Sequence, residues 1–521
     1  MISYRPFRLE IPIWLRLETF HVGTGQQLSL ASDSPILRDE NDAPYLPASS
    51  LRGLLRAHLE REAPLLGCTQ SNIDALFGHA PTRNSDDEED EDGNGAAVAG
   101  GNALSAIGRL QVSDSRLRVP AATHPTEVRD HVRVNPKTGA AQHKGKFDAE
   151  ASTGDHLLDC TLVYEGESPQ DTELLLVHEA LRALENGELH CGAKSGWGYG
   201  RLWAPQIRYH AFDRTTPTGL AAFCAQRLEA QQPEPAPLFK WPPPKPHSLP
   251  VDPDLPAWSW LELYLDLAFE GPALVRAPIP PTGSKTTRID ASKHQLYPEK
   301  GLVTADQLFI QTGSPGRYYL PGSSLRGVLR GQANRIANTM GRQTPFDTLF
   351  GTINEKDGTG RKSLIEAGDG FLEGDPKPVY LDHVAIDRIT GFAADSKKFS
   401  TCALQSPCFR TRLRVRFSRT DLSAVALFGF VLRDLCEGWL WAGGGVTRGF
   451  GHLPQVKIQY LALNCTSEFT IPGSLLPDVK RLPFPGRTRL ATSGPIEFYS
   501  LHWLWTEAEA AWNAIPAKGA A

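Results

Sequence analysis

One segment combines glycines, a cation and aromatic rings in a pattern that suits contact with RNA. Residues 192–200 read Gly-Ala-Lys-Ser-Gly-Trp-Gly-Tyr-Gly, which places Lys194 close to Trp197 and Tyr199. Glycine lets a backbone approach a phosphodiester, lysine neutralises phosphate charge, and aromatic rings stack on bases. The segment lacks the Gly-x-x-x-x-Gly-Lys-Ser/Thr pattern of a triphosphate loop and follows a predicted helix. The alternative interpretation is a tight turn that needs positive φ.

Two arginine pairs point to phosphate contact. Arg52 and Arg56, and again Arg326 and Arg330, lie one helical turn apart, and each pair follows a Pro-x-Ser-Ser sequence. A helix N-terminus adds backbone donors for an anion, so the pair and the serines together suit a phosphate. A solvated helix face is the alternative. We favour phosphate contact because the arrangement occurs twice.

Two Asp-His-Val segments, at 130–132 and 382–384, adjoin basic, glycine-containing stretches. The basic residues are Arg129, Arg133, Lys137, Lys144 and Lys146 in the first stretch, and Arg388, Lys397 and Lys398 in the second. This composition predicts a long hairpin that protrudes from a sheet. His131 and His383 are candidate general bases, but an aspartate next to them in sequence gives no orienting geometry in itself.

These segments recur because the chain contains two copies of one unit. Residues 46–56 recur at 320–330 with nine of eleven positions identical, an offset of 274. The pairs 74–78 with 347–351, 130–139 with 382–391, and 192–202 with 443–453 follow in the same order, with offsets of 273, 252 and 251. An ordered repeat of this kind predicts two homologous domains.

The elements within each copy predict a mixed fold. Residues 7–20 and 258–269 alternate apolar with polar side chains and are predicted as half-buried strands. A helix follows each Pro-x-Ser-Ser, with Ser49 and Ser323 as predicted N-caps. A second helix is predicted at 172–186, and again from Thr420 to a stop at Gly438. This order suits an α+β fold of two tandem ferredoxin-like domains, each with a β-hairpin and inserted loops.

The repeat also predicts the domain boundaries. The first domain is 1–210, with a disordered acidic loop at about 80–104, and the second is 257–462. A proline-rich linker at 211–256 joins them, with its densest polyproline stretch at 231–246. A C-terminal extension at 463–521 carries Trp503, Trp505 and Trp512, which we interpret as a docking or core element.

The net charge of −5 does not exclude an RNA partner. Seven of the acids form one run at 86–92, and without that run the balance is +2. No stretch approaches the ~18 apolar residues of a membrane span, and the amino terminus lacks the features of a signal peptide. The eight cysteines form no Cys-x-x-Cys pair. We therefore expect a cytoplasmic protein with reduced cysteines.

Taken together, the motifs resemble those of a known family. The chain carries His21-Val22-Gly23-Thr24-Gly25, then 33–39 (Asp-Ser-Pro-Ile-Leu-Arg-Asp), Leu-Pro-x-Ser-Ser-Leu-Arg-Gly, and a late Gly-x-Lys-Ser-x-x-Gly-Tyr-Gly. This combination resembles the RAMP superfamily of CRISPR-associated proteins, and more narrowly the Cas-seven-type backbone subunits of type III effector complexes. The tandem arrangement resembles the fused double subunit of type III-D complexes.

The resemblance implies a function in antiviral defence. Such subunits have an RRM-like palm and a β-hairpin thumb, bind CRISPR RNA beside other effector-complex subunits, and cut complementary single-stranded target RNA about every six nucleotides with Mg²⁺ or another divalent metal. The family motif places the catalytic aspartate at Asp33. In the second copy the nearest match is Asp306, one residue before Gln307, and Asp290 is its rival. An aspartate there would hold a metal or orient the ribose 2′-hydroxyl.

The resemblance and the motifs together give the residues expected to contact RNA. They are His21, Ser49, Ser50, Arg52, Arg56, Arg129, Arg133, Lys137, Lys194, Trp197, Tyr199, Ser323, Ser324, Arg326, Arg330, His383, Arg388 and Arg448.

Three alternative functions stay open. One is a catalytically inactive structural backbone subunit. Another is a RAMP-type CRISPR RNA processing endonuclease that uses a histidine such as His21. The third is a generic single-strand RNA-binding protein.

Overall fold

The computed structural model describes fourteen stretches of the chain. They are residues 5–23, 32–79, 106–118, 126–135, 141–154, 156–228, 259–277, 287–290, 302–312, 317–353, 359–466, 480–484, 487–493 and 502–516. The acidic run at 86–92 and the polyproline stretch at 231–246 lie outside them. Within these stretches, no helix combines the length and the apolar character that crossing a membrane requires.

The chain forms two compact units whose boundaries differ from those of the sequence repeat. Unit 1 comprises Met1–Thr126, Glu150–Ala193 and Gly200–Asp252, and unit 2 comprises Glu127–Ala149, Lys194–Tyr199 and Pro253–Ala521. Residues 127–149 and 194–199, which belong to the first repeat in sequence, therefore pack within unit 2. The predicted boundaries at 210 and 256 follow the repeat rather than these contacts.

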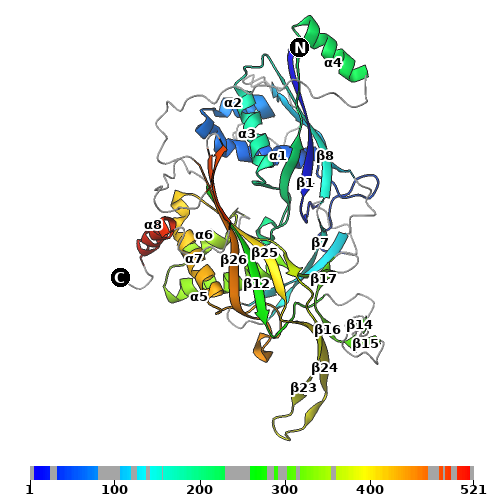
Figure 1. Ribbon diagram of the computed structural model, residues 1–521, viewed down its shortest axis with the longest axis vertical. Helices are drawn as coiled ribbons and strands as arrows, with labels where there is room; N and C mark the ends of the chain where they lie inside the picture. Colours follow the sequence, from blue (N-terminus) through cyan, green and yellow to red (C-terminus); the bar gives the residue numbers. More distant parts are fainter. Residues whose placement is uncertain are drawn as a thin grey trace, which may run out of the picture. The chain divides into compact units, whose positions relative to one another are not determined.

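An antiparallel sheet centred on β1 forms the base of unit 1 (Figure 1). Its order is β4-β8-β1-β10-β9, with β4 at Leu110–Val112, β8 at His156–Gly166, β1 at Phe7–Leu17, β10 at Arg201–Ile207 and β9 at Leu189–His190. In addition, β5 (Arg116–Leu117) pairs with β8. Alternate residues of β1 are buried, which confirms the strand predicted from the alternating sequence.

Helices cover this sheet and close the core of unit 1. They are α1 (Ala48–Glu62), the 3₁₀ turn η1 (Ala63–Leu66), α2 (Gln70–Phe77) and α3 (Glu173–Glu185). Leucines of α1 and α3 share one buried cluster with the inward residues of β1. A short pair, β2 (Gly78–His79) with β3 (Ala106–Ile107), follows α2. The position of α3 confirms the helix predicted at 172–186.

The amino-terminal part of the predicted linker is regular structure. β11 (His210–Asp213) pairs with β1, and α4 (Pro217–Leu228) follows it. Phe212 is buried and packs edge-on against Phe223, at 5.5 Å between ring centroids. The prediction of a linker is therefore wrong for residues 211–228, because β11 adds to the sheet of unit 1 and α4 follows it.

Unit 2 is built on a larger antiparallel sheet centred on β12 (Ser259–Glu270), which confirms the strand predicted at 258–269. Its order is β17 (Gln311–Thr312), β18 (Arg317–Leu320), β22 (Gly370–Glu373), β25 (Cys408–Phe417), β12, β26 (His452–Thr466), β28 (Arg487–Ser493) and β27 (Lys480–Phe484), and β21 (Ile365–Ala367) also pairs with β25. Strands β27 and β28 lie in the predicted C-terminal extension, so part of that extension belongs to this sheet.

The described part of unit 2 contains four α-helices. They are α5 (Gly322–Thr339), α6 (Thr344–Phe350), α7 (Leu422–Cys436), preceded by η4 (Arg419–Asp421), and α8 (His502–Asn513). α7 confirms the second predicted helix. Trp512 of α8 is 2% exposed and packs edge-on against Phe430, at 5.5 Å. This burial confirms our interpretation of the carboxy-terminal aromatic run as a core element for Trp512.

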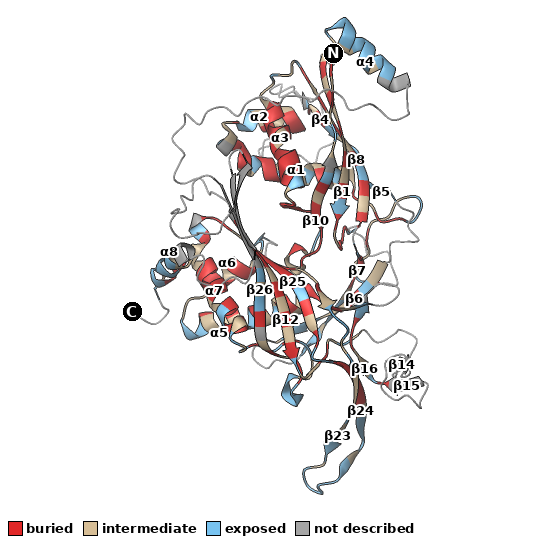
Figure 2. Cartoon of the chain, viewed as in Figure 1, coloured by how far each residue is buried: buried red, intermediate tan, exposed pale blue. Residues whose placement is uncertain are grey.

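Two long hairpins occur where the basic stretches predict them. The first consists of β6 (Thr126–Val134) and β7 (Ala141–Ser152), and the second of β23 (Pro378–Ile386) and β24 (Ala393–Gln405). β24 also pairs with β13 (Pro272–Ala273) and with β16 (Gln307–Leu308), while β14 (Thr287–Asp290) pairs with β15 (Leu302–Ala305) and β19 (Thr352–Ile353) with β20 (Gly360–Arg361). The β23–β24 hairpin extends from unit 2 and is largely exposed (Figures 1 and 2).

The helices that follow Pro-x-Ser-Ser begin two residues earlier than predicted. α1 begins at Ala48 and α5 at Gly322, each directly after a proline. Ser49 and Ser323 therefore lie inside the first turn and make no side-chain cap. The prediction that they are N-caps is wrong, because Pro47 and Pro321 occupy the N-cap positions and their carbonyls accept the first helical N–H bonds.

Distant aspartates satisfy the first turns of these helices instead. The backbone N–H of Ala48 donates to Asp114 Oδ1, and that of Gly322 donates to Asp369 Oδ1, both at 2.8 Å. A carboxylate at a helix N-terminus accepts an otherwise unsatisfied donor and interacts favourably with the helix dipole. Asp114 and Asp369 thus occupy equivalent positions in the two units.

Candidate functional site

Asp33 is an exposed residue of unit 1, in a segment that pairs with the residues just after β1. Gly23 and Ile36 form an antiparallel bridge, and the backbone N–H of Leu37 donates to the carbonyl of Val22 at 2.7 Å. These contacts fix the chain three and four residues after Asp33. Asp33 itself is exposed just before this fixed segment.

A buried histidine supports the Asp33 loop from beneath. His21 is 3% exposed, with Nδ1 2.6 Å from the carbonyl oxygen of Glu150 and Nε2 3.0 Å from Ser34 Oγ. The backbone N–H of Glu150, on β7, donates to the carbonyl of Ser34 at 3.0 Å, and its carboxylate accepts the N–H of Ile36 at 3.0 Å and a bond from Arg38. Because both ring nitrogens have partners, His21 positions the loop in this structure.

Asp306 occupies the equivalent backbone position in unit 2. Arg276 and Phe309 form the bridge that corresponds to Gly23 with Ile36, and the N–H of Ile310 donates to the carbonyl of Val275 at 2.8 Å. Ile36 and Leu37 thus correspond to Phe309 and Ile310, an offset of 273 residues. The same offset aligns Asp306, and not Gln307, with Asp33.

The support of Asp306 differs from that of Asp33. Ser400 of β24 donates its backbone N–H to Asp306 Oδ2 at 2.7 Å and its hydroxyl to the same oxygen at 3.1 Å. The carbonyl of His21 accepts the N–H of Ala193, and the carbonyl of Leu274 accepts the N–H of Gly444, the matching residue of the second glycine-rich segment. Leu274 therefore takes the place of His21 in unit 2.

Asp290 lies away from the loop position that Asp33 and Asp306 share. It is the last residue of β14 and pairs with Leu302 of β15. Its backbone is part of a two-stranded ribbon, whereas Asp306 follows β15 directly. The bridge and hydrogen-bond register thus favour Asp306 over Asp290 as the counterpart of Asp33.

The donor set around these aspartates suits a partial metal site. Within the described residues, no three His, Cys, Asp or Glu side chains group closely enough to hold a metal ion. Mg²⁺ commonly binds through one or two carboxylates and completes its shell with water and substrate phosphates. A single exposed aspartate fits such a shared site and does not fit a protein-only cage.

The repeated arginines Arg52 and Arg326 each bond the carboxy-terminal end of the next helix, α2 or α6. Arg52 donates to the carbonyl of Phe77, and Arg326 donates to the carbonyl of Phe350 at 3.0 Å. Each guanidinium also lies over the ring of that phenylalanine, at 5.7 and 5.4 Å. Burial, with a smaller contribution from Arg330, lowers the pKa of Arg326 to about 10. This packing explains why the two motifs recur together.

The second arginine of each pair has different partners in the two units. Arg56 bonds Glu60 at 2.8 Å, Asp74 at 3.1 Å and the carbonyl of Gly78 at 3.1 Å. Arg330 is exposed and lies over the ring of Phe346, at 5.5 Å. Phosphate contact by these arginines stays a prediction.

Arg129 of the first hairpin is buried in unit 2. Its guanidinium donates to Asp369 Oδ2 and to the hydroxyl of Tyr199, both at 2.8 Å, and lies 4.7 Å from the ring centroid of Tyr319. The side chain is 5% exposed. Burial alone would lower the pKa of Arg129, but Asp369 and the tyrosines raise it well above its usual value. The arginine anchors the hairpin, so contact with RNA would require this pair to open.

The glycine-rich segment forms the tight turn that was the alternative interpretation. Lys194 and Gly198 have φ of 66° and 79° on either side of the 3₁₀ turn η3 (Ser195–Trp197). A Cβ on Gly198 would lie 2.5 Å from the Cα of Gly368, so the turn packs closely within unit 2. The second copy repeats the geometry around η5 (Val446–Arg448), flanked by Gly445 and Gly449 with φ of 79° and 84°. RNA contact by this segment stays a prediction.

His131 lies in an aromatic stack at the base of the first hairpin. Its ring centroid is 4.3 Å from that of Trp197 and 5.3 Å from that of Phe147. Its Nε2 is buried and bonds to no residue that the structure describes. Burial first, and then the charges of Lys194 and Arg129, lower the pKa of His131 to about 4. The ring is therefore neutral at pH 7.

Acidification is expected to weaken this stack. Below pH 6.5 an unfolded chain protonates His131, whereas the folded chain does so only near pH 4. Folding stability should therefore fall as the pH drops from 6.5 to 4, by on the order of 1–2 kcal/mol at pH 5. Chemical unfolding at pH 7 and pH 5 measures this loss. His131→Phe should flatten the pH dependence, and an unchanged slope in that variant would contradict the assignment.

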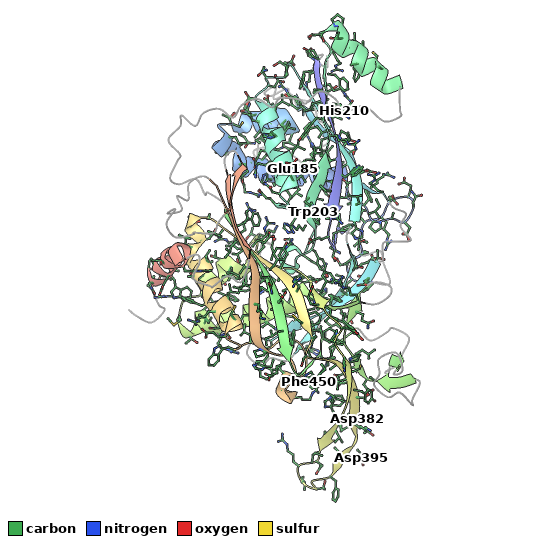
Figure 3. All side chains as sticks on the ribbon, in the orientation of Figure 1. Glu185, Trp203, His210, Asp382, Asp395 and Phe450 are labelled. Atoms are coloured by element: carbon green, nitrogen blue, oxygen red, sulfur yellow. The ribbon has the colours of Figure 1, made fainter. Side chains whose placement is uncertain are left out.

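The second hairpin repeats the stack with a cation in place of the tryptophan. His383 stacks on Phe399, at 4.8 Å, and lies 5.8 Å from Phe450. Arg448, at the position of Trp197, lies 5.1 Å from the centroid of Phe399. Burial and then the charge of Arg448 lower the pKa of His383. Figure 3 shows Phe450 near the base of this hairpin and Asp382 along it.

The predicted RNA-contacting residues thus fall into three groups. Exposed are Ser49, Arg133, Arg330, Arg388 and Arg448, and partly exposed are Ser50, Arg52, Arg56, Lys194, Trp197, Ser323, Ser324, Arg326 and His383. Buried are His21, Arg129 and Tyr199. Lys137 lies outside the described residues.

Sequence reasoning missed four residues that shape these sites. Glu150 ties the Asp33 loop to β7, Tyr319 and Asp369 receive Arg129, and Asp114 caps α1. The sequence did contain a signal for the two aspartates. Ser-Asp-Ser at 113–115 matches Gly-Asp-Gly at 368–370 with an offset of 255, which lies between the offset of 273 for the preceding repeated motif and that of 252 for the following one. Glu150 has no such counterpart.

Comparison with known sequences agrees with the repeated architecture. A search of curated proteins found no match. The sequence profile of the RAMP superfamily matches residues 16–203 and 302–453, which together make up more than half of the chain. The two regions contain both sets of repeated motifs, and the mixed antiparallel α+β structure is the predicted fold class. With its two matched regions, the chain belongs to the RAMP superfamily as a tandem member.

Proposed function

We propose that the chain is a cytoplasmic, CRISPR RNA-binding backbone subunit of a type III effector complex, of the fused double kind found in III-D complexes, and that it cleaves complementary target RNA. One observation carries this proposal. Asp33 and Asp306 are exposed at equivalent backbone positions, and each loop is hydrogen-bonded to the second strand of a basic hairpin. The proposed partners are CRISPR RNA, target single-stranded RNA and neighbouring effector subunits.

The proposed chemistry needs little more than a positioned carboxylate. An aspartate beside a ribose would orient the 2′-hydroxyl and accept its proton while the 2′ oxygen attacks the adjacent phosphorus. The bond to the 5′ oxygen breaks, and water protonates that oxygen, which leaves a 2′,3′-cyclic phosphate and a 5′-hydroxyl. Mg²⁺ held between Asp33 or Asp306 and the RNA phosphates would neutralise charge on the phosphate.

Exposed cations on the hairpins suit the RNA backbone. Arg133 and Lys144 of the first hairpin and Arg388 and Lys397 of the second are exposed. Lys146 and Lys398 are exposed too, although each pairs with the aspartate of its own hairpin, Asp130 at 3.0 Å and Asp382 at 3.2 Å. Cations arrayed in this way give binding that is independent of sequence and sensitive to salt.

The test is binding and cleavage by the chain assembled with its effector subunits. We expect guide RNA binding that weakens steeply with salt, and Mg²⁺-dependent cuts about six nucleotides apart in complementary RNA only. Labelled target RNA on a sequencing gel measures the spacing, and a scrambled target is the control. Equal binding of any single strand without guide partners would favour a generic RNA-binding protein, and binding without cuts would favour an inactive backbone subunit.

A further inference from the structure

Unit 1 contains the same side-chain arrangement that receives Arg129 in unit 2. In unit 2, Leu320 pairs with Gly370, and Tyr319 and Asp369 are their neighbours in sequence. In unit 1, Leu46 forms the matching bridge with Ser115, so Tyr45 and Asp114 take the places of Tyr319 and Asp369. The shared bond from the first turn of the following helix to the aspartate confirms this correspondence.

The two arrangements differ in exposure. Asp369 is 8% exposed and Tyr319 1% exposed, because Arg129 and its hairpin cover them. Asp114 is exposed and Tyr45 is half-buried. Unit 1 therefore presents at its surface a tyrosine ring and a carboxylate that unit 2 uses to bind an arginine.

The second hairpin of this chain does not match that surface. Lys398 pairs with Asp382 as Lys146 pairs with Asp130, and His383 stacks on Phe399 as His131 stacks on Phe147, which fixes the alignment of the hairpins. In this alignment Leu381 occupies the position of Arg129. A leucine would leave the carboxylate of Asp114 covered and unpaired, which is unfavourable.

We propose that Tyr45 and Asp114 form a docking site for an arginine carried on a β-hairpin of a different protein, and that Leu381 keeps a second copy of this chain out. The partner's guanidinium would lie over the Tyr45 ring and bond the Asp114 oxygen that does not cap α1. Charge complementarity and the arrangement around Arg129 carry the proposal, which is independent of any RNA cleavage.

One further difference sets the site apart from its counterpart. A Cβ on Gly322 would lie 2.0 Å from the carbonyl oxygen of Ala367 and 2.7 Å from that of Trp197, so both β21 and the turn at 194–199 pack closely against this glycine. Unit 1 has Ala48 at this position. A hairpin that docks on unit 1 would therefore meet an alanine where unit 2 has a glycine.

The full chain tests the site by gain of function. Wild type should sediment as a single 57.1 kDa copy. Leu381→Arg, alone or with Ala48→Gly, should produce head-to-tail oligomers, because the hairpin of one copy then fits Asp114 of the next. Adding Asp114→Asn should weaken this association roughly a hundredfold. Asp159→Asn, which removes an exposed acid of β8, is the matched control and should leave it unchanged.

Three results would overturn the proposal. Leu381→Arg chains that stay monomeric with and without Ala48→Gly would show that the surface does not bind a hairpin arginine. Oligomers that persist with Asp114→Asn would place the contact elsewhere. Wild-type oligomers that dissociate on Asp114→Asn would make a second copy the natural occupant. Each readout is mass, so RNA cleavage has no bearing on it.

Discussion

Replacing Asp33 and Asp306 together by alanine is expected to reduce target RNA cleavage by about 10²–10⁴-fold, the range that a positioned proton-accepting side chain supplies. Guide RNA binding should remain, because neither carboxylate is part of the cationic hairpins. The measurement is a single-turnover rate of cutting by the assembled complex in Mg²⁺. Asp382→Ala, which removes an exposed acid of the second hairpin, is the matched control and should cut normally.

The single variants make the expectation sharper. Each chain supplies one aspartate from each unit, so Asp33→Ala should remove alternate cuts and double the spacing between those that remain. Asp306→Ala should remove the complementary set. Asp290→Asn should change nothing if the hydrogen-bond register identifies the right residue. Cuts that persist in the double variant would exclude the aspartates as catalytic residues.

The histidine alternative has a different signature. His21 is enclosed beneath the Asp33 loop with both ring nitrogens bonded. His21→Gln should therefore lower cutting at the Asp33 sites only, through misplacement of the loop. Metal-independent cleavage of precursor RNA that disappears in this variant would instead favour a processing endonuclease.

The repeated strands and helices could be predicted from sequence because short-range patterns determine them. The alternation in β1 and β12, and the stops at Gly187 and Gly438, lie within a few residues of the elements they define. The roles of the arginines could not be predicted in this way. Arg52 and Arg326 bond carbonyls on a following helix, and only the packed fold shows that Phe77 and Phe350 come within reach.

The position of the second aspartate shows the limit of alignment. An offset of 274, taken from the Leu-Pro-x-Ser-Ser motif, selects Gln307, and the bridges in the structure give 273 and select Asp306. A loop between two motifs can gain or lose one residue without any local signal. Only backbone pairing, which depends on residues distant in sequence, fixes the register.

The division into compact units also lay beyond sequence reasoning. The first hairpin follows the pattern of the first repeat, yet residues 127–149 pack within unit 2. The contact depends on Arg129, Tyr319 and Asp369, which are far apart in sequence and belong to no shared motif. From sequence alone, an arginine in a basic stretch is expected to face solvent or a phosphate rather than to form a buried ion pair.

Breaking the buried pair is expected to have the largest effect on stability. Arg129 and Asp369 are 5% and 8% exposed and lie 2.8 Å apart. Removing one partner leaves an uncompensated charge away from water, which costs about 3–5 kcal/mol. Arg129→Leu should therefore destabilise the full chain by about this amount, because it leaves Asp369 buried and unpaired. Chemical unfolding measures the loss, and hydrogen exchange should show reduced protection in β6 and β7.

An exposed pair on the same hairpin provides the control. Lys146 and Asp130 lie 3.0 Å apart, and the lysine is 67% exposed. Asp130→Asn should change stability by about 1 kcal/mol or less, because water screens exposed ion pairs. Equal losses in Asp130→Asn and Arg129→Leu would contradict a special role for the buried pair.

The double variant separates charge from packing. Asp369→Asn keeps the oxygen that caps α5 and removes the negative charge, so in combination with Arg129→Leu neither unit charge remains buried. If uncompensated charge causes the loss, the double variant should be more stable than either single variant, since replacing a whole buried ion pair is often nearly neutral. If the guanidinium's packing against Tyr319 and Tyr199 dominates, the double variant should be as unstable as Arg129→Leu alone. Leu381 already occupies the matching position of the second hairpin, so leucine is compatible with the backbone of such a strand.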